Sequence, residues 1–179
     1  RPVSLQQIVD ARAGKKPFAE FMKQEIFQPA GMIHTVVLTH PGQEVKNRVT
    51  GYKFHRGKWI ESRLDTHAYG DGQIMTTPND FASWEKALHE YKVLDAKSLS
   101  LAQKSSTLKN GKPTDYGFGW WINSPKVISH EGCWNGTATF NVRYLGKGSV
   151  QVLSNSENLM VGELANKTLT VWFGGEIER

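Results

Sequence analysis

The stretch Thr137–Tyr144 (TATFNVRY) decides the fold class of this chain of 179 residues. Apolar or aromatic side chains stand at every second position, from Ala138 to Tyr144, which is typical of a β-strand with one buried face. Gly146–Gly148 then predicts a tight turn, and Val150–Leu153 predicts a second strand that returns alongside the first. The sequence therefore predicts an antiparallel hairpin in the C-terminal half of the chain.

Strands and a helix extend this hairpin in both directions along the chain. Tyr116–Ile122 and Val127–Ser129 predict two preceding strands, so the sheet is expected to be an antiparallel meander. Around Asn155 the period of the apolar positions changes from two to about 3.6, which predicts a final helix over Leu159–Phe173. Its expected buried face consists of Val161, Leu164, Ala165, Thr168, Leu169 and Trp172.

Further helices are expected in the N-terminal half. They cover residues 4–13, the segment from Pro17 to Gly31, the segment after the N-cap Thr77, where Asp80 completes a capping-box pattern, and a short helix from Asp95. Helical spacing predicts core positions at Phe18, Phe21, Met22, Ile26, Phe81, Trp84, Leu88 and Tyr91. Residues 49–61 predict a separate hairpin. We therefore expect an α+β class, an antiparallel sheet with flanking helices, in a single lobe over residues 1–179.

The composition argues against several classes of function. The net charge is +5, but the lysines are scattered and no arginine-rich arm or zinc-finger spacing is present, so nucleic-acid binding is not expected. No apolar run reaches the roughly 18 residues of a membrane span. The six histidines lack the spacing of metal ligands and Cys133 has no second cysteine, so no metal, cofactor or internal disulfide is expected.

Five short segments follow one another in an order that resembles a known family. They are Phe21–Met32 (FMKQEIFQPAGM) with Thr35, Tyr69–Gly72 (YGDG) with Thr77–Phe81 (TPNDF), Tyr116–Trp120 (YGFGW), Ser129–Gly132 (SHEG) and Val152–Asn155 (VLSN). Together they resemble the serine beta-lactamase-like superfamily, which includes class C beta-lactamases, penicillin-binding DD-peptidases and related esterases. The resemblance implies the C-terminal part of a beta-lactamase-like (DD-peptidase) fold.

The resemblance also implies three catalytic motifs, of which this sequence contains the third. The family uses S-x-x-K for the nucleophile, Y-x-N or S-x-N for a base and an amide, and K-T-G or H-x-G on a strand beside the cleft. Ser83 with Lys86 and Ser106 with Lys109 match S-x-x-K, but two matches among twelve serines are near the number expected by chance. We therefore expect the chain to be the C-terminal part of such a domain, with the S-x-x-K and Y-x-N motifs absent from it.

His130 is the first candidate for chemistry, as the histidine of H-x-G. Its imidazole would face the nucleophile and could steer a substrate carboxylate or protonate a leaving group. The alternative is a structural histidine at a strand end. Gly132 would let the substrate backbone approach the strand, because a side chain would block it. The resemblance implies that the residue after the motif, Cys133, offers its backbone N–H to an oxyanion.

Two further residues are candidates for substrate binding. Tyr69 resembles the tyrosine that lines the acyl pocket of class C beta-lactamases, and the alternative is a core tyrosine before a glycine loop. Asn155 lies near the place where those enzymes recognise a substrate carboxylate, and a turn or helix cap is the alternative. Glu131 departs from the family pattern, and its negative charge disfavours anionic beta-lactam substrates.

The expected function is that of the C-terminal part of a serine hydrolase, which transfers and hydrolyses the acyl group of an amide or ester. A chain without the nucleophile is expected to be inactive alone. The alternative is a non-catalytic binding module derived from the same fold. The expected partners are a small-molecule or peptide substrate and either the missing N-terminal half or a second copy of the chain. The resemblance implies a periplasmic or secreted location.

Overall fold

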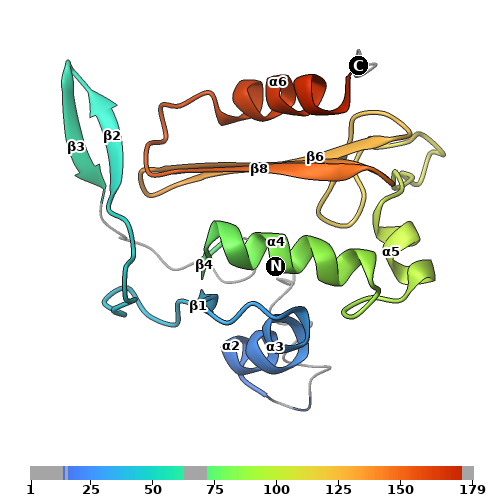
Figure 1. Ribbon diagram of the computed structural model, residues 1–179, viewed down its shortest axis with the longest axis horizontal. Helices are drawn as coiled ribbons and strands as arrows, with labels where there is room; N and C mark the ends of the chain where they lie inside the picture. The colour runs from blue at the N-terminus through green and yellow to red at the C-terminus, as the bar shows by residue number, and fades with distance from the viewer. Residues whose placement is uncertain (1–13, 15, 63–71, 175–179) are drawn as a thin grey trace. The chain divides into compact units, whose positions relative to one another are not determined.

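The computed structural model describes residues 14, 16–62 and 72–174 (Figure 1). The helix expected over residues 4–13 and the expected acyl-pocket residue Tyr69 lie outside the described residues. The chain divides into two compact units, Arg1–Arg48 with Leu64–Leu94 and Val49–Arg63 with Asp95–Arg179. Helices and antiparallel strands occur in both units, which confirms the expected α+β class.

The first unit begins with one continuous helical segment. It consists of α2 (Phe18–Phe21), the π-helical stretch η1 (Met22–Phe27) and α3 (Gln28–Ala30). The segment ends at Gly31, whose φ of 74° is a left-handed conformation that glycine adopts without a steric penalty. The predicted helix between Pro17 and Gly31 is therefore confirmed.

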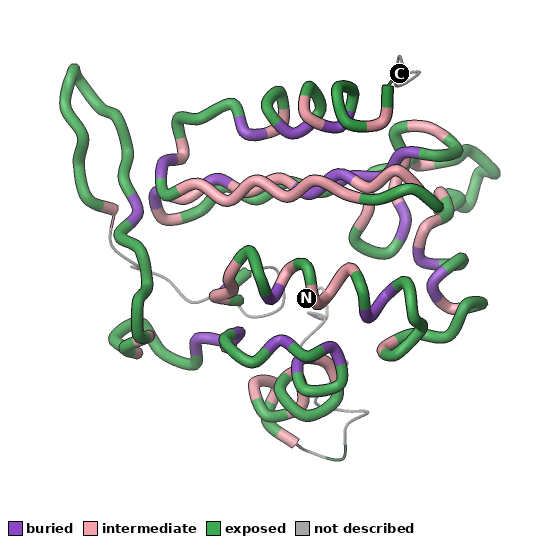
Figure 2. Tube along the Cα trace, in the orientation of Figure 1, coloured by how far each residue is buried: buried purple, intermediate pink, exposed green. Residues whose placement is uncertain are grey.

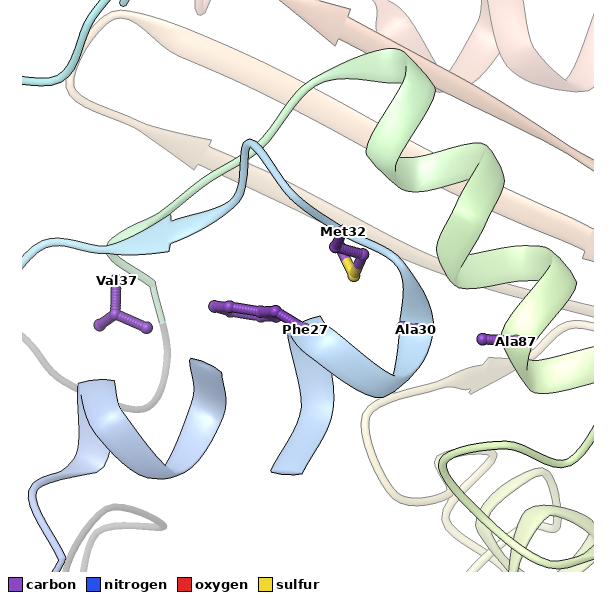
Figure 3. Packing of buried hydrophobic residues seen from close by; sticks show 5 residues of the cluster. All are labelled: Phe27, Ala30, Met32, Val37 and Ala87. Carbon is purple, nitrogen blue, oxygen red and sulfur yellow. The ribbon is translucent and has the colours of Figure 1, made fainter. Parts of the chain in front are cut away.

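The π-helical stretch changes which side chains of this segment face the core. A π-helix holds more residues per turn than an α-helix, so it rotates the later side chains relative to strict α-helical spacing. Phe27, which that spacing does not select, is buried with Ala30, Met32, Val37 and Ala87 in one cluster (Figure 3). The predicted core residues Phe18, Phe21, Met22 and Ile26 are half-buried.

Helix α4 (Pro78–His89) begins as predicted and ends earlier than expected. The hydroxyl of Thr77 accepts the backbone N–H of Asp80 at 3.1 Å, which is an N-cap bond. Leu88 is buried, but Tyr91 lies beyond the last turn with a φ of 56° and is 55% exposed, so its predicted core position is wrong. The unit also contains a short antiparallel pair, β1 (Val36–Val37) with β4 (Ile74–Met75).

The second unit is built on a four-stranded antiparallel sheet in the order β5-β6-β7-β8. Its strands are β5 (Trp121–Ile122), β6 (Val127–Trp134), β7 (Thr137–Tyr144) and β8 (Gly148–Ser154). Each strand pairs with the next one along the chain, which confirms the predicted meander. The register places His130 opposite Asn141 and Gly132 opposite Thr139.

Helix α6 (Val161–Phe173) packs along one face of this sheet, against β7 and β8 (Figure 1). Val161, Ala165 and Leu169 are buried there, as the sequence predicts. At about 100° per residue, a stripe of every fourth residue drifts around the helix by about 40° at each step. The last turn therefore presents Phe173 to Tyr144, with ring centroids 5.9 Å apart.

The prediction that Leu164 and Trp172 are buried is wrong. They are 57% and 77% exposed. Each directly precedes a residue of the buried stripe, Ala165 or Phe173, and is therefore rotated about 100° from it. Figure 2 shows that the side of α6 turned away from the sheet is exposed.

The strand expected over Tyr116–Ile122 is wrong except for the two residues of β5. The backbone N–H of Gly117 donates to the carbonyl of Trp120 at 2.7 Å, so the segment is a tight turn. This turn brings Tyr116 opposite Trp121 as an isolated antiparallel bridge. A Cβ on Gly117 would lie 2.3 Å from the carbonyl oxygen of Ala102, so the turn is packed against the end of the preceding helix.

The remaining elements of the second unit match their predictions. The preceding helix, α5 (Ala96–Ala102), is capped by Asp95, whose carboxylate accepts the backbone N–H of Ser98 at 2.7 Å. Strands β2 (Gly51–His55) and β3 (Lys58–Ser62) form the expected hairpin around a two-residue turn. No helix in the described part of the chain is long and apolar enough to cross a membrane.

Candidate active site

Strand β6 has a buried half and an exposed half. Val127, Ile128 and Ser129 are buried, whereas the five residues from His130 to Trp134 are exposed. Strand β5 pairs only with Ile128 and Ser129, so in the described part of the chain no strand flanks the His130–Trp134 edge opposite β7. A strand edge of this kind carries backbone groups that are available to a ligand or to another segment.

His130 has a defined partner on the side of the site formed by the Tyr116 turn. Its Nε2 lies 2.9 Å from the phenolic oxygen of Tyr116. The Tyr116 ring meets the Trp121 ring edge to face, with centroids 4.8 Å apart and an angle of 74° between the planes. The first residue of the exposed half of β6 is therefore tied to β5 through a tyrosine.

The environment keeps the Tyr116 hydroxyl protonated. Partial burial raises the pKa of Tyr116 above its usual value of 10.0, and the negative charge of Glu131 raises it further. A phenol that stays neutral can both donate a hydrogen bond to an imidazole and accept one from it.

Gly132 is constrained within the sheet itself. A Cβ at this position would lie 2.8 Å from the hydroxyl oxygen of Thr139, the residue directly opposite on β7. This contact explains a glycine without reference to any substrate. Cys133, the next residue, is an exposed free cysteine opposite Ala138.

Asn155 lies at the same end of the sheet as Cys133. It follows Ser154, which pairs with Ala138, the residue that also pairs with Cys133. Its side-chain amide donates to the carbonyl of Thr50 at 3.1 Å, which ties the end of β8 to the entry of the hairpin. The turn role, left open as an alternative by the sequence, therefore has a geometric basis.

The β2–β3 hairpin is attached to the sheet at this same end. The backbone N–H of Tyr52 is shared between the carbonyls of Gly136 and Asn155, each 2.9 Å away. The Asn158 side chain accepts the backbone N–H of Phe54 at 2.6 Å. A shallow cavity of about 350 Å³ results, lined by Tyr52, Trp59, Asn155 and Ser156.

The two serines that match S-x-x-K have ordinary surroundings. Ser83 lies within α4 and is half-buried. Both backbone groups of Ser106 are bonded to the Tyr116 turn, its N–H to the Tyr116 carbonyl at 2.8 Å and its carbonyl to the N–H of Thr114 at 2.9 Å. Among the residues that the structure describes, no three His, Cys, Asp or Glu side chains cluster as metal ligands would.

Sequence reasoning missed the residues that contact the motif. Tyr116 was expected within a strand, and nothing in its spacing from His130 marks the two as partners. A contact between Gly132 and the neighbouring strand could be expected, because each residue of H-x-G on a strand has a residue opposite it. The sequence does not say that this residue is Thr139. Finding it requires the register of the sheet.

A four-stranded antiparallel sheet with a helix on one face, in a chain with further flanking helices, is the α+β architecture of the beta-lactamase class of domains. The chain belongs to the beta-lactamase family, whose family model matches residues 3–170. It is 29% identical over 168 residues to penicillin-binding protein 4* of Bacillus subtilis (strain 168). This alignment covers 84% of this chain and 37% of that protein.

Solved structures show the same fold. The octameric penicillin-binding protein homologue from Pyrococcus abyssi superposes with a TM-score of 0.81 at 20% identity, over 98% of this chain and 42% of that one. The D-amino acid amidase from Ochrobactrum anthropi SV3 superposes with a TM-score of 0.69 at 19% identity, over 96% of this chain and 56% of that one. The chain therefore spans between about a third and just over half of the length of these relatives.

Proposed function

We propose that the chain contributes the H-x-G strand beside the active-site cleft of a serine hydrolase, which acts by acyl transfer on an amide or ester. The observation that carries the proposal is His130 at the start of the exposed edge of β6, in a chain of the beta-lactamase family. The names of its relatives, a penicillin-binding protein and a D-amino acid amidase, favour peptide or amide substrates.

In the proposed reaction, the oxygen of a nucleophilic serine forms a bond to the acyl carbon of the substrate. The C–N or C–O bond to the leaving group breaks, and the departing amine or alcohol takes up a proton. Water then adds to the acyl carbon, the bond to the serine oxygen breaks, and the acid is released. We propose that this serine belongs to S-x-x-K, and its base to Y-x-N, in parts of the protein outside these 179 residues.

Each predicted site residue then has a proposed role. His130 donates a hydrogen bond to the substrate or a proton to the leaving group. Gly132 allows the substrate backbone to lie along β6, and the backbone N–H of Cys133 stabilises the oxyanion. Asn155 and Tyr69 are proposed to contact the substrate. The carboxylate of Glu131, the middle residue of H-x-G, disfavours anionic substrates.

Complementation tests this proposal directly. The 179-residue chain alone is expected not to hydrolyse nitrocefin, p-nitrophenyl esters or D-alanyl peptides above background. A protein or added segment that supplies S-x-x-K and Y-x-N should restore turnover. In that complex, His130→Ala should lower kcat/KM about 100-fold or more, because a positioned proton donor is lost.

The matched control is His55→Ala, which removes another exposed histidine from a strand of the same unit. It should leave turnover unchanged. Turnover by the isolated chain that disappears in Ser106→Ala or Ser83→Ala would overturn the proposed location of the nucleophile. Saturable ligand binding without turnover in the complemented protein would favour the non-catalytic binding module instead.

The proposed partner of the chain is the segment that carries these motifs or, in its absence, a second copy of the chain. In the described part of the chain, the segment His130–Cys133 of β6 has a neighbouring strand on one side, and its other edge offers a surface for such association. The Pyrococcus abyssi homologue is itself octameric. Analytical ultracentrifugation should show self-association of the isolated chain that the added segment reverses, and a monomer at all concentrations would contradict this.

A further inference from the structure

We infer that Tyr116 is a positioning residue for His130, and that its hydroxyl sets the orientation and the tautomer of the imidazole. The inference rests on the proposed function only for the catalytic role of His130, because the contact itself is observed independently of that role. The geometry is a contact of 2.9 Å between the phenolic oxygen and Nε2. The ring centroids are 6.0 Å apart at an angle of 60°, so the hydroxyl, not a stacked ring, makes the contact.

Tyr116 is held firmly enough to act as a reference point. Its carbonyl accepts the N–H of Ser106 at 2.8 Å and the hydroxyl of Thr114 at 2.9 Å. Its ring packs against Trp121, the residue with which it forms a bridge. His130 lies on the exposed half of β6, where few neighbours restrict its side chain. The tyrosine therefore orders the histidine, not the reverse.

The chemistry of the pair selects one tautomer of the neutral imidazole. A phenol is a better hydrogen-bond donor than a neutral imidazole N–H, and an unprotonated imidazole nitrogen is a good acceptor. The hydroxyl therefore donates to Nε2, and the ring proton resides on Nδ1. Nδ1–H is then the group through which the neutral ring of His130 can donate a hydrogen bond to a substrate.

The same contact accommodates the protonated ring. When the imidazole gains a proton at Nε2, the phenolic oxygen accepts that N–H without any movement of the ring. His130 can thus change protonation state while its orientation stays the same. A positioned donor depends on this property, because displacement of a reacting group by about 1 Å can cost about 100-fold in rate.

The test measures the tautomer by NMR on the ¹⁵N-labelled 179-residue chain at mildly alkaline pH. Two-bond correlation spectra distinguish protonated from unprotonated ring nitrogens, and His130→Gln identifies the His130 signals among the six histidines. In the unsubstituted chain, Nε2 should show the shift of an unprotonated nitrogen and Nδ1 that of a protonated one. In Tyr116→Phe, which keeps the ring against Trp121, the Nε2 signal should move toward the protonated value.

The control is Tyr91→Phe, which removes a hydroxyl from an exposed tyrosine in the other unit and should leave the His130 signals unchanged. A predominant Nε2–H tautomer in the unsubstituted chain would overturn the inference without any variant. So would a His130 spectrum that is identical in Tyr116→Phe.

Activity of the complemented protein gives a second readout. Tyr116→Phe should lower kcat about tenfold while KM changes less than about twofold, because the substrate is still bound but the donor is misplaced. The tautomer experiment involves no catalysis, so its failure is separate from failure of the proposed function. If Tyr116 sets the tautomer but His130→Ala retains full activity, the proposed function fails and the positioning contact stands.

Discussion

The hydroxyl of Thr35 donates a hydrogen bond of 2.6 Å to the carboxylate of Asp80, forty-five residues further along the chain. The same carboxylate oxygen of Asp80, Oδ2, also accepts the backbone N–H of His34 at 2.8 Å. Asp80 is buried, with 2% of its surface exposed. The sequence predicts that Asp80 completes a capping box at the start of α4. Its carboxylate instead fastens the segment after α3 to the first turn of that helix, where a negative charge is also favoured by the helix dipole.

Asp80→Ala is expected to lower the free energy of unfolding by about 2–4 kcal/mol, because two donors lose their buried acceptor. Urea denaturation followed by circular dichroism measures the change. Asn79→Ala, at the exposed neighbouring position, should change it by less than about 0.5 kcal/mol. A loss below about 1 kcal/mol in Asp80→Ala would mean that the contact with Thr35 contributes little.

Gly136 joins the sheet to the β2–β3 hairpin, and its replacement tests that junction. A Cβ at Gly136 would lie 2.4 Å from the backbone nitrogen of Tyr52, at a φ of 75°. Gly57 has a φ of 78° but no atom within 4 Å of an added Cβ, so it is a matched control. Gly57→Ala should cost about 1 kcal/mol from backbone strain alone, and Gly136→Ala at least about 2 kcal/mol more.

Thermal melts of both variants, followed by the fluorescence of tryptophan, measure this difference. Trp59, on β3, is one of the six tryptophans that contribute to this signal. Equal melting temperatures for Gly136→Ala and Gly57→Ala would contradict the close approach of Gly136 to Tyr52.

Gly132→Ala is expected to destabilise the sheet through Thr139, whose hydroxyl oxygen lies 2.8 Å from the added Cβ. The cost should be about 1–2 kcal/mol, as for other overpacked positions. Thr139→Ala should remove most of this cost in the double variant, and a double-mutant cycle by urea denaturation measures the coupling. Additive effects would contradict the contact.

The double variant Gly132→Ala/Thr139→Ala also separates packing from function. In the complemented protein it should be nearly as stable as Thr139→Ala alone but should still lose turnover, because the added methyl group blocks the approach of the substrate backbone. Full turnover in this variant would assign Gly132 to packing alone.

Tyr116 is expected to resist ionisation at alkaline pH. Burial first, and then the charge of Glu131, raise its pKa above 10.0. Because the pKa of Tyr116 is higher in the folded chain than in the unfolded chain, the protonated phenol stabilises the folded state. This contribution to the free energy of unfolding is fully present below the unfolded-state pKa and is lost as the pH rises through the folded-state pKa. Phenolate absorbance, compared between the chain and Tyr116→Phe, isolates this tyrosine among the five.

Glu131→Gln should lower the pKa of Tyr116 toward its usual value by removing the nearby negative charge. Glu61→Gln, on β3, serves as the control and should leave the titration of Tyr116 unchanged. A Tyr116 titration that is the same in all three proteins would show that the charge of Glu131 does not reach the phenol.

Parts of the candidate site are visible in the sequence because they are contiguous. His130 and Gly132 belong to H-x-G and Cys133 directly follows it, so the family resemblance suffices to select them. Their roles in catalysis stay predictions. Asn155 was selected in the same way, but its contact with Thr50 depends on how the hairpin meets the sheet. The strand predicted over Val127–Ser129 is too short, because β6 continues to Trp134.

The amino-acid sequence by itself determined the strands β7 and β8, the caps at Thr77 and Asp95, and the family. The strands and caps depend on side-chain alternation and on hydrogen bonds within a single turn, so neighbouring residues contain all the necessary information. The family depends on the order of short segments along the chain, which the sequence also contains. Only the tertiary structure decided that Tyr116 meets His130, that Asp80 holds Thr35, and that α6 turns Phe173 and not Trp172 toward the sheet. Each of these depends on which distant segments pack together, and a local period of apolar residues does not encode that pairing.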